Sequence, residues 1–192
     1  MPDYTGTSGN NLYDFNGLIG GETIDGLGGQ DTIDGSSNNN NYLYDLENNV
    51  ISLTDGSFAA TLLNFEEVIG GNGDDIIIGC TTSAIYNLDG GEGDDTVSPG
   101  SAGNDQLWGN FNADTFVFTA AFGQDTVMDF DANNNFERID LSGATTITDF
   151  TDLINNHANQ VGSNVFINAH AGNTILLMNV NLADLDNIDF IF

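Results

Sequence analysis

The amino-acid sequence predicts an all-β fold, a parallel β-roll of nonapeptide repeats with a C-terminal β cap. Three observations lead to this prediction. A nine-residue motif recurs between residues 17 and 117, each copy carries a large apolar residue at one fixed position, and after Val117 the motif gives way to ordinary strand and turn sequence. Repeats of this length are typical of solenoids, because each unit buries its apolar residue only by stacking on its neighbours.

The clearest copies follow the template GGxGxDxUx, in which U is a large apolar residue. They are GGNGDDIII at 70–78, GGEGDDTVS at 90–98, GSAGNDQLW at 100–108 and GNFNADTFV at 109–117. We expect the eighth residue of each copy to point inward and to stack as a narrow core between two sheets. These residues are Ile77, Val97, Leu107 and Phe116.

A weaker series of repeats comes before these copies. It reads GLIGGETID at 17–25, GLGGQDTID at 26–34 and GSSNNNNYL at 35–43, with Ile24, Ile33 and Tyr42 at the eighth positions. The period of nine persists while the motif decays, since Glu22 replaces Asp in the first copy and Asn38 and Asn40 replace Gly and Asp in the third.

Residues 44–69 lie between the two arrays and show apolar alternation, as at Ile51 and Leu53, around a turn at Asp55-Gly56. Alternation with a period of two is typical of strands, so we expect a strand pair that extends the same sheet. We therefore divide the chain into a β-roll at 1–118, with arrays at about 8–43 and 70–118 joined by the strand pair at 44–69, and a cap at 119–192. Both parts are expected to form one continuous folding unit.

The cap is expected to hold strands near 125–130, 138–141, 164–168 and 174–179. A short helix is expected near 150–157, because Phe150, Leu153 and Ile154 have helical spacing and follow the capping candidates Thr148 and Asp149.

The charge of the chain limits its partners. Asp and Glu total 29 against one basic residue, Arg138, which gives a formal net charge of -28. Nucleic acid and anionic membranes are excluded as partners, because both require Lys and Arg. External cations are needed to offset the repulsion, and hard divalent cations with oxygen ligands fit best. Cys80 is the only cysteine, so we expect a metal ion rather than a disulfide to stabilise the fold.

The residue types at fixed positions of the repeat indicate calcium binding. Glycines at positions 1, 2 and 4 let backbone carbonyls converge, and Asp at position 6 adds an anionic oxygen close to the turn. Successive repeats turn on opposite edges, so Asp75, Asp95 and Asp114 are expected on one edge and Asp105 on the other. Residues 79–89 fill one repeat slot, but the turn of this piece lacks an Asp, so no full site is expected beneath Asp105 on that side.

These residues closely resemble the repeats-in-toxin family of hemolysin-type calcium-binding repeats. NFEEVIGGNGDDIIIG at 64–79 is similar to the family's entry into a repeat array. Four further segments resemble the C-terminal region of serralysin-type, type I secreted proteins: ADTFVF at 113–118, GQDTVMDFD at 123–131, ERIDLS at 137–142 and LADLDNIDFIF at 182–192.

The resemblance implies a parallel β-roll with several calcium ions between its turns, export by a type I secretion apparatus through an uncleaved C-terminal signal, and an extracellular location. The family's turn ligands fall on Gly71, Gly73 and Asp75, on Gly91, Gly93 and Asp95, and by partial match on Gly103 with Asp105 and Gly29 with Asp31. Asp114 joins this set through its place on the edge of Asp75 and Asp95. The N-terminus carries no leader pattern and no membrane-span pattern, so no membrane insertion is expected.

The sequence lacks the parts of an enzyme. No HExxH motif is present, and the two histidines, His157 and His170, are too few for a zinc site. No GxSxG motif occurs, and Glu66 and Glu67 would face opposite sides of a strand rather than form a glycosidase pair. Arg138 is expected to pair with Asp140 or Asp131. We expect a non-enzymatic module.

Two alternatives to a calcium-dependent folding module stay open. The chain could be the non-catalytic C-terminal part of a secreted hydrolase, or an adhesive, surface-associated β-roll that binds a cell-surface glycan or ice. The seventh positions argue against an ice-binding ladder, because they form a broken row: Thr23, Thr32, Asn41, Ile76, Thr96, Gln106 and Thr115.

Overall fold

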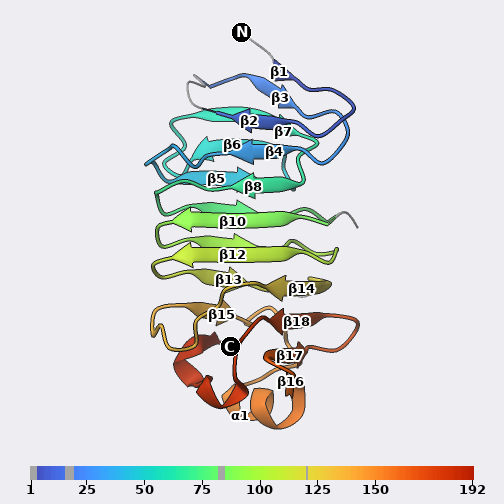
Figure 1. Cartoon of the computed structure of the whole chain (residues 1–192), viewed down its shortest axis with the longest axis vertical. Helices are drawn as coiled ribbons and strands as arrows, with labels where there is room; N and C mark the ends of the chain where they lie inside the picture. Colours follow the sequence, from blue (N-terminus) through green and yellow to red (C-terminus); the bar gives the residue numbers. More distant parts are fainter. Residues whose placement is uncertain (1–3, 16–19, 82–84, 120) are drawn as a thin grey trace.

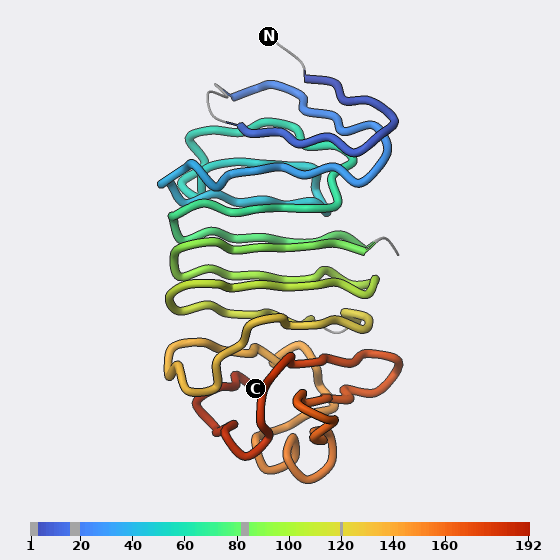
Figure 2. Tube along the Cα trace, in the orientation of Figure 1, coloured from blue at the N-terminus to red at the C-terminus, as the bar shows by residue number. Residues whose placement is uncertain are grey.

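The computed structural model describes residues 4–15, 20–81, 85–119 and 121–192. The chain winds into a tall stack of flattened coils, with the N-terminus at one end and an irregular cap at the other (Figure 1, Figure 2). Two sheets face each other across the stack, and the coils alternate between them.

The first sheet, called sheet A, has ten strands among the described residues. In spatial order they are β1 (Tyr4–Thr5), β3 (Thr23–Asp25), β7 (Ala59–Leu63), β6 (Val50–Leu53), β5 (Tyr42–Asp45), β9 (Ile76–Ile78), β11 (Thr96–Ser98), β13 (Thr115–Val117), β15 (Arg138–Asp140) and β19 (Phe190–Ile191). All neighbours run parallel except β5 with β6 and β6 with β7.

The second sheet, called sheet B, has nine strands within the described part of the chain. In spatial order they are β16 (Ala158–Val161), β17 (Asn164–Asn168), β18 (Thr174–Leu177), β14 (Gln124–Val127), β12 (Gln106–Phe111), β10 (Asn87–Glu92), β8 (Glu67–Ile69), β4 (Thr32–Asp34) and β2 (Leu12–Asp14). Only the β16–β17–β18 segment is antiparallel. The predicted parallel β-roll is therefore confirmed.

The narrow core runs between the sheets as predicted. Within sheet A, Ile77 is paired with Val97 on the neighbouring strand, and Val97 with Phe116. Within sheet B, Leu88 is paired with Leu107. These side chains are at most 1% exposed. Burial of one such side chain contributes roughly 1.5–3 kcal/mol, so stacking coil on coil stabilises strands of only three residues.

Tyr42, the eighth residue of the third weak copy, is buried in the core, but the residue paired with Ile77 is Tyr44. The coil that ends in β5 contains two more residues than the nine-residue period allows, so it places two inward residues, Tyr42 and Tyr44, on the core side. Both rings are buried, and Tyr42 packs edge-on against Phe15 at 4.9 Å between ring centroids. The rest of the weaker series keeps its period at Ile24 and Ile33, although residues 17–19 of its first copy lie outside the described residues.

The segment between the arrays forms the predicted strand pair. Strands β6 and β7 run antiparallel on either side of Asp55-Gly56, and both extend sheet A. Strand β8 then returns the chain to sheet B, where it lies between β4 and β10. The two arrays are thereby joined within both sheets.

The cap closes the far end of the roll. Its helix consists of α1 (Phe150–Asp152) followed by a π-helical turn at Leu153–His157, and Asp149 caps it by accepting a hydrogen bond from the Asp152 N–H at 2.9 Å. Two 3-10 turns follow at Leu182–Asp184 and Asn187–Asp189. The four predicted cap strands correspond to β14, β15, β17 and β18. Within the described residues, no helix is long and apolar enough to span a membrane.

Candidate metal centre

Acidic side chains form two columns along the edges of the roll, at the starts of the strands or one residue before them. One column, on the sheet A edge, contains Asp75, Asp95 and Asp114. The other, on the sheet B edge, contains Asp105 and Asp125. All five side chains are at most 2% exposed. The predicted division of Asp75, Asp95 and Asp114 from Asp105 therefore matches the strand pairing.

Hydrogen bonds link each column into a ladder. The Asp75 N–H donates to Asp95 Oδ1 at 2.7 Å, and the Asp95 N–H donates to Asp114 Oδ1 at 2.9 Å. On the other edge, the Asp105 N–H donates to Asp125 Oδ1 at 2.9 Å. One oxygen of each acceptor carboxylate is thus used to hold the previous turn of its column in place.

A tyrosine occupies the acid position at the start of each ladder. The Tyr42 N–H donates to Asp75 Oδ1 at 2.6 Å, and the Tyr86 N–H donates to Asp105 Oδ1 at 2.8 Å. Tyr86 belongs to the irregular piece at 79–89, of which residues 82–84 lie outside the described residues. The position beneath Asp105 therefore holds a tyrosine in place of an acid.

A second, outer ladder runs in the opposite direction on the sheet A edge. Here the Asp74 N–H donates to Asn41 Oδ1, the Asp94 N–H to Asp74 Oδ1, and the Ala113 N–H to Asp94 Oδ1, at 3.0–3.1 Å. The sequence analysis missed this ladder, although the doubled Asp of GGNGDD and GGEGDD signals it. Two opposed ladders fix the spacing between successive turns.

The second oxygens of the column carboxylates are the exceptional feature of these edges. The Oδ2 atoms of five aspartates are buried and have no hydrogen-bond partner: Asp31, Asp95, Asp105, Asp114 and Asp125. Asp75 differs, because its Oδ2 accepts a hydrogen bond from the Gly71 N–H at 2.7 Å. Burying a carboxylate oxygen without a partner costs free energy, so a bound cation near these atoms would stabilise the fold.

Burial also disfavours the ionised form of these acids when no cation is present. Burial raises the pKa of Asp95 to about 8, and the neighbouring charges of Asp75 and Asp114 add to the effect. The pKa of Asp125 is raised to about 8 and that of Asp114 to about 7, again chiefly by burial. The pKa of Asp105 rises to about 6 for the same reason. A bound cation would reverse these shifts by favouring the carboxylates.

The glycines of the turns leave room for backbone oxygens. Gly91 has a φ of +104° and Gly93 a φ of +134°. A Cβ added to Gly91 would overlap the carbonyl oxygen of Gly71, and one added to Gly93 would overlap that of Gly73. Successive turns therefore pack backbone on backbone, with carbonyl oxygens facing the spaces that side chains would fill. The predicted Gly29 and Gly103 also have positive φ, at +135° and +114°.

The donor set fits a hard cation. Carbonyl and carboxylate oxygens are the ligands that Ca²⁺ prefers. Among the described residues, no group of three His, Cys, Asp or Glu side chains could hold a metal. A cation at these turns would therefore take most of its ligands from backbone carbonyls and one or two from aspartates.

Two acidic residues of the sheet B edge escaped the sequence analysis. Asp125 belongs to FGQDTV at 122–127, which repeats the GxDxU core of the motif after a two-residue offset from the preceding copy. Glu66 accepts a hydrogen bond from the Asp31 N–H at 3.0 Å. Asp31 itself lies on this edge, and its Oδ1 accepts a hydrogen bond from the Asn11 N–H at 2.7 Å.

The single basic residue does not neutralise the columns. Arg138 was expected to pair with Asp140 or Asp131, but its guanidinium donates to the carbonyl oxygens of Glu137 and Asn135, each at 2.7 Å. The ion pair found among the described residues joins His157 and Asp152 at 3.6 Å, within the cap. Backbone carbonyls are concentrated in the loop before β15, and they satisfy the planar guanidinium without a carboxylate.

Comparisons with known proteins identify a family for this chain. The family described as peptidase M10 serralysin C terminal matches residues 22–192. Among solved structures, the extracellular lipase LipA from Serratia marcescens resembles the chain with a TM-score of 0.41 and 18% sequence identity. The similarity covers 97% of this chain and 39% of the lipase chain, so the chain spans less than half of the lipase's length. A search of curated proteins found no significant match.

Proposed function

Since this chain belongs to the peptidase M10 serralysin C-terminal family, we propose that it is a secreted module that binds several calcium ions and folds around them outside the cell. The observation that carries the proposal is the set of five buried Oδ2 atoms without hydrogen-bond partners. Calcium supplies the positive charge that the described residues do not bring to these columns.

The residues that would hold calcium come from three parts of the roll. On the sheet A edge they are Gly71, Gly73, Asp75, Gly91, Gly93, Asp95 and Asp114. On the sheet B edge they are Gly103 and Asp105, to which we add Asp125 because of its buried Oδ2, and in the N-terminal array they are Gly29 and Asp31. The glycines would contribute carbonyl oxygens and the aspartates carboxylates.

The proposal is tested by the secondary structure of the chain with and without calcium. In excess chelator, repulsion within a chain of net charge -28 should keep it largely unfolded, and millimolar calcium should restore the β structure. At tenfold above its Kd, each ion adds roughly 1.4 kcal/mol, so about three ions contribute roughly 4 kcal/mol. A circular dichroism spectrum rich in β structure in chelator, and unchanged by calcium, would contradict the proposal.

Export by a type I secretion apparatus is the second part of the proposal. Calcium is scarce in the cytosol, so the acidic chain would stay extended enough to pass a channel, and extracellular calcium would fold it and prevent return. The last residues would serve both as an export signal and as part of the cap. Phe190 is buried and packs against Phe150 at 6.0 Å between ring centroids, and Asp189 is fully buried.

Deletion of residues 189–192 tests both roles of the tail. We expect slower secretion through a matched exporter, and a higher calcium concentration for folding of the purified chain. The Ile191→Ala variant is the matched control, because that side chain is 42% exposed and its loss should change the cap little. Normal export together with an unchanged calcium titration of the deletion variant would refute both roles.

The family match favours one further interpretation, that this chain is the non-catalytic C-terminal part of a secreted hydrolase. The matching family is named for the C-terminal region of a peptidase. Expression of the chain alone, followed by assay of protease and esterase activity with and without calcium, tests it. We expect no activity from the isolated chain, whereas turnover abolished by a substitution in this chain would contradict the assignment.

A further inference from the structure

The two repeat arrays meet on the sheet B edge at a place where the motif is absent. Strand β4 pairs with β8 so that Thr32 lies opposite Glu67, which puts Glu66 opposite Asp31. The Asp31 N–H donates to Glu66 Oε2 at 3.0 Å, as the Asp75 N–H donates to Asp95 within the array. Glu66 therefore occupies the acid position of a repeat, although it belongs to none.

The chain reaches Glu66 through a shorter turn than the repeats use. Only Asn64 and Phe65 separate β7 from Glu66, whereas five residues, 70–74, separate β8 from Asp75. A Glu side chain is one methylene longer than that of Asp, which lets its carboxylate reach the column from this shorter turn. Asn64 has a φ of +58° and turns the chain in the place of a glycine.

Oxygens converge at this junction as they do in the array. A Cβ added to Gly26 would overlap the Asn64 carbonyl oxygen and lie 2.6 Å from Asp31 Oδ2. A Cβ added to Gly70 would likewise overlap the Gly90 carbonyl oxygen and lie 2.8 Å from Asp75 Oδ2. The junction thus reproduces the carbonyl and carboxylate pair of a repeat turn, with Asn64 in the place of Gly90.

The Asp31 side chain lacks a partner for one of its oxygens. It is fully buried, and its Oδ2 has no hydrogen-bond partner, while Oδ1 accepts from both the Asn11 N–H and the Asn11 side-chain amide at 2.7 Å. Asp31 and Glu66 are thus two adjacent acids, and none of the hydrogen bonds or ion pairs found in the described part of the chain brings a basic group to either. Their mutual repulsion would be relieved by a cation.

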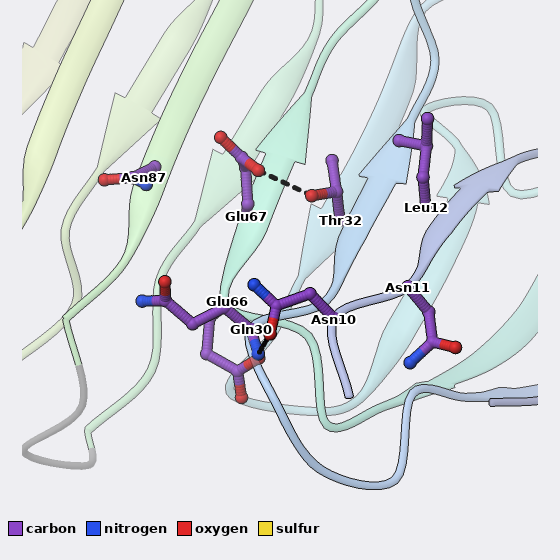
Figure 3. Close-up of a pocket in the computed structure, with 8 residues that line it drawn as sticks. All are labelled: Asn10, Asn11, Leu12, Gln30, Thr32, Glu66, Glu67 and Asn87. Carbon is purple, nitrogen blue, oxygen red and sulfur yellow. Dashed lines mark hydrogen bonds between the residues drawn. The ribbon is translucent and has the colours of Figure 1, made fainter. Parts of the chain in front are cut away.

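We propose that Asp31, Glu66 and the Asn64 carbonyl hold a divalent cation of the calcium class, and that this ion joins the N-terminal array to the C-terminal one. The inference rests on the proposed function and adds a site in which two non-repeat residues, Asn64 and Glu66, join the repeat residue Asp31. A polar cavity of about 210 Å³ opens beside Glu66, and the side chains of Asn10, Asn11 and Gln30 line it (Figure 3). This cavity gives a hydrated ion a route to the junction.

The neighbouring carboxylate offers a matched control. Glu67, the first residue of β8, lines the same cavity, but its carboxylate lies apart from that of Glu66 and accepts a hydrogen bond from the Thr32 hydroxyl instead (Figure 3). Glu66→Gln keeps an oxygen that can accept from the Asp31 N–H but removes the charge. Glu67→Gln removes the same charge one residue away, so repulsion across the whole molecule changes equally in both variants.

The experiment measures amide hydrogen exchange of the full chain across a calcium titration. In E66Q, protection of β4 should require about tenfold more calcium than in the wild type, because the ion loses an anionic ligand. Protection of β11 should keep its wild-type midpoint, and E67Q should behave as wild type in both strands. Equal midpoints for E66Q and E67Q in β4 would overturn the inference.

A second measurement tests the site if the N-terminal array of E66Q stays unfolded at every calcium concentration. It uses the wild type only. Mn²⁺ is added to the calcium-folded wild type, and paramagnetic broadening of backbone amide signals is recorded. The site predicts broadening at Asp31 and Glu66 comparable to that at Asp95, and its absence at the first two residues would overturn the inference. If calcium protects neither β4 nor β11 in the wild type, the proposed function itself is wrong.

Discussion

The C-terminal array and the N-terminal array use the same coil but hold their edges together differently. In the C-terminal array, Asp75, Asp95 and Asp114 repeat one side chain in one position, and each turn is tied to the next by the same hydrogen bond. In the N-terminal array, the corresponding column on the sheet B edge is mixed, with Asn11, Asp31 and Glu66. The strand register survives this change, because the inward apolar residues set it.

The comparison separates two roles of the nine-residue motif. Its eighth residue builds the roll, and this role persists where the motif is weak, as at Ile24 and Ile33. Its glycines and its sixth residue build the edge, and only the C-terminal array keeps both through successive turns. Substitutions at the edges should therefore have larger effects in the C-terminal array than elsewhere.

The largest effect is expected from Gly91→Ala, with Gly56→Ala as its counterpart in an ordinary turn. Both glycines have positive φ, +104° and +75°, but an added Cβ at Gly91 would overlap a backbone oxygen, whereas at Gly56 it would meet nothing within 4 Å. We expect a loss of about 3 kcal/mol or more at Gly91 and about 1 kcal/mol at Gly56. Urea unfolding in saturating calcium measures both, and similar losses would mean that the turns do not pack as tightly as described.

A smaller effect is expected from Asp95→Ala, compared with Asp31→Ala. Asp95 lies in the middle of its column, where it accepts from the Asp75 N–H and donates to Asp114. Its loss should lower the calcium affinity by about tenfold and reduce cooperativity, while that of Asp31 should lower the affinity by about threefold. Isothermal titration calorimetry gives both values. Equal losses would remove the distinction between the two columns.

The smallest effect is expected from a change of pH on the residual β structure of the calcium-free chain. The folded-state pKa values of Asp95 and Asp114 are raised to about 8 and about 7, above the value near 4 of an unfolded chain. A carboxyl whose pKa is higher in the folded chain stabilises the fold fully when the pH is below its pKa in the unfolded chain. This stabilisation is lost as the pH rises through its pKa in the folded chain. Residual β structure in chelator should therefore increase from pH 8 to pH 5, mainly in β11 and β13.

Hydrogen exchange in chelator at several pH values tests this expectation strand by strand. In saturating calcium the trend should reverse, because protons compete with the ion for the same carboxylates. A calcium-free fold whose protection is independent of pH would show that these acids do not limit folding.

Much of the fold could be predicted from the sequence, because one inward residue per coil is a strong periodic signal. The β-roll and the strand pair around Asp55-Gly56 follow from that signal and from turn chemistry. Strand β16 could not be predicted, since its sequence lacks apolar alternation. The division of the chain at residue 118 stays a prediction.

The candidate site could be predicted only in part. Asp75, Asp95, Asp105 and Asp114 follow from the motif, and the structure places them in two columns. Glu66 could not be predicted, because its position depends on the pairing of β8 with β4, more than thirty residues away in the sequence. Likewise, the inward place of Tyr44 depends on the length of one turn, which a fixed period cannot anticipate.

The central claim is that cations satisfy the buried second oxygens of the edge aspartates, and a crystal structure at saturating calcium tests it most directly. Anomalous scattering locates the ions independently of the ligands. The account predicts calcium within about 2.3–2.6 Å of Oδ2 of Asp95 and Asp114 on one edge and of Asp105 or Asp125 on the other. Well-ordered turns in which these oxygens contact only water or protein donors, with no anomalous density beside them, would contradict it.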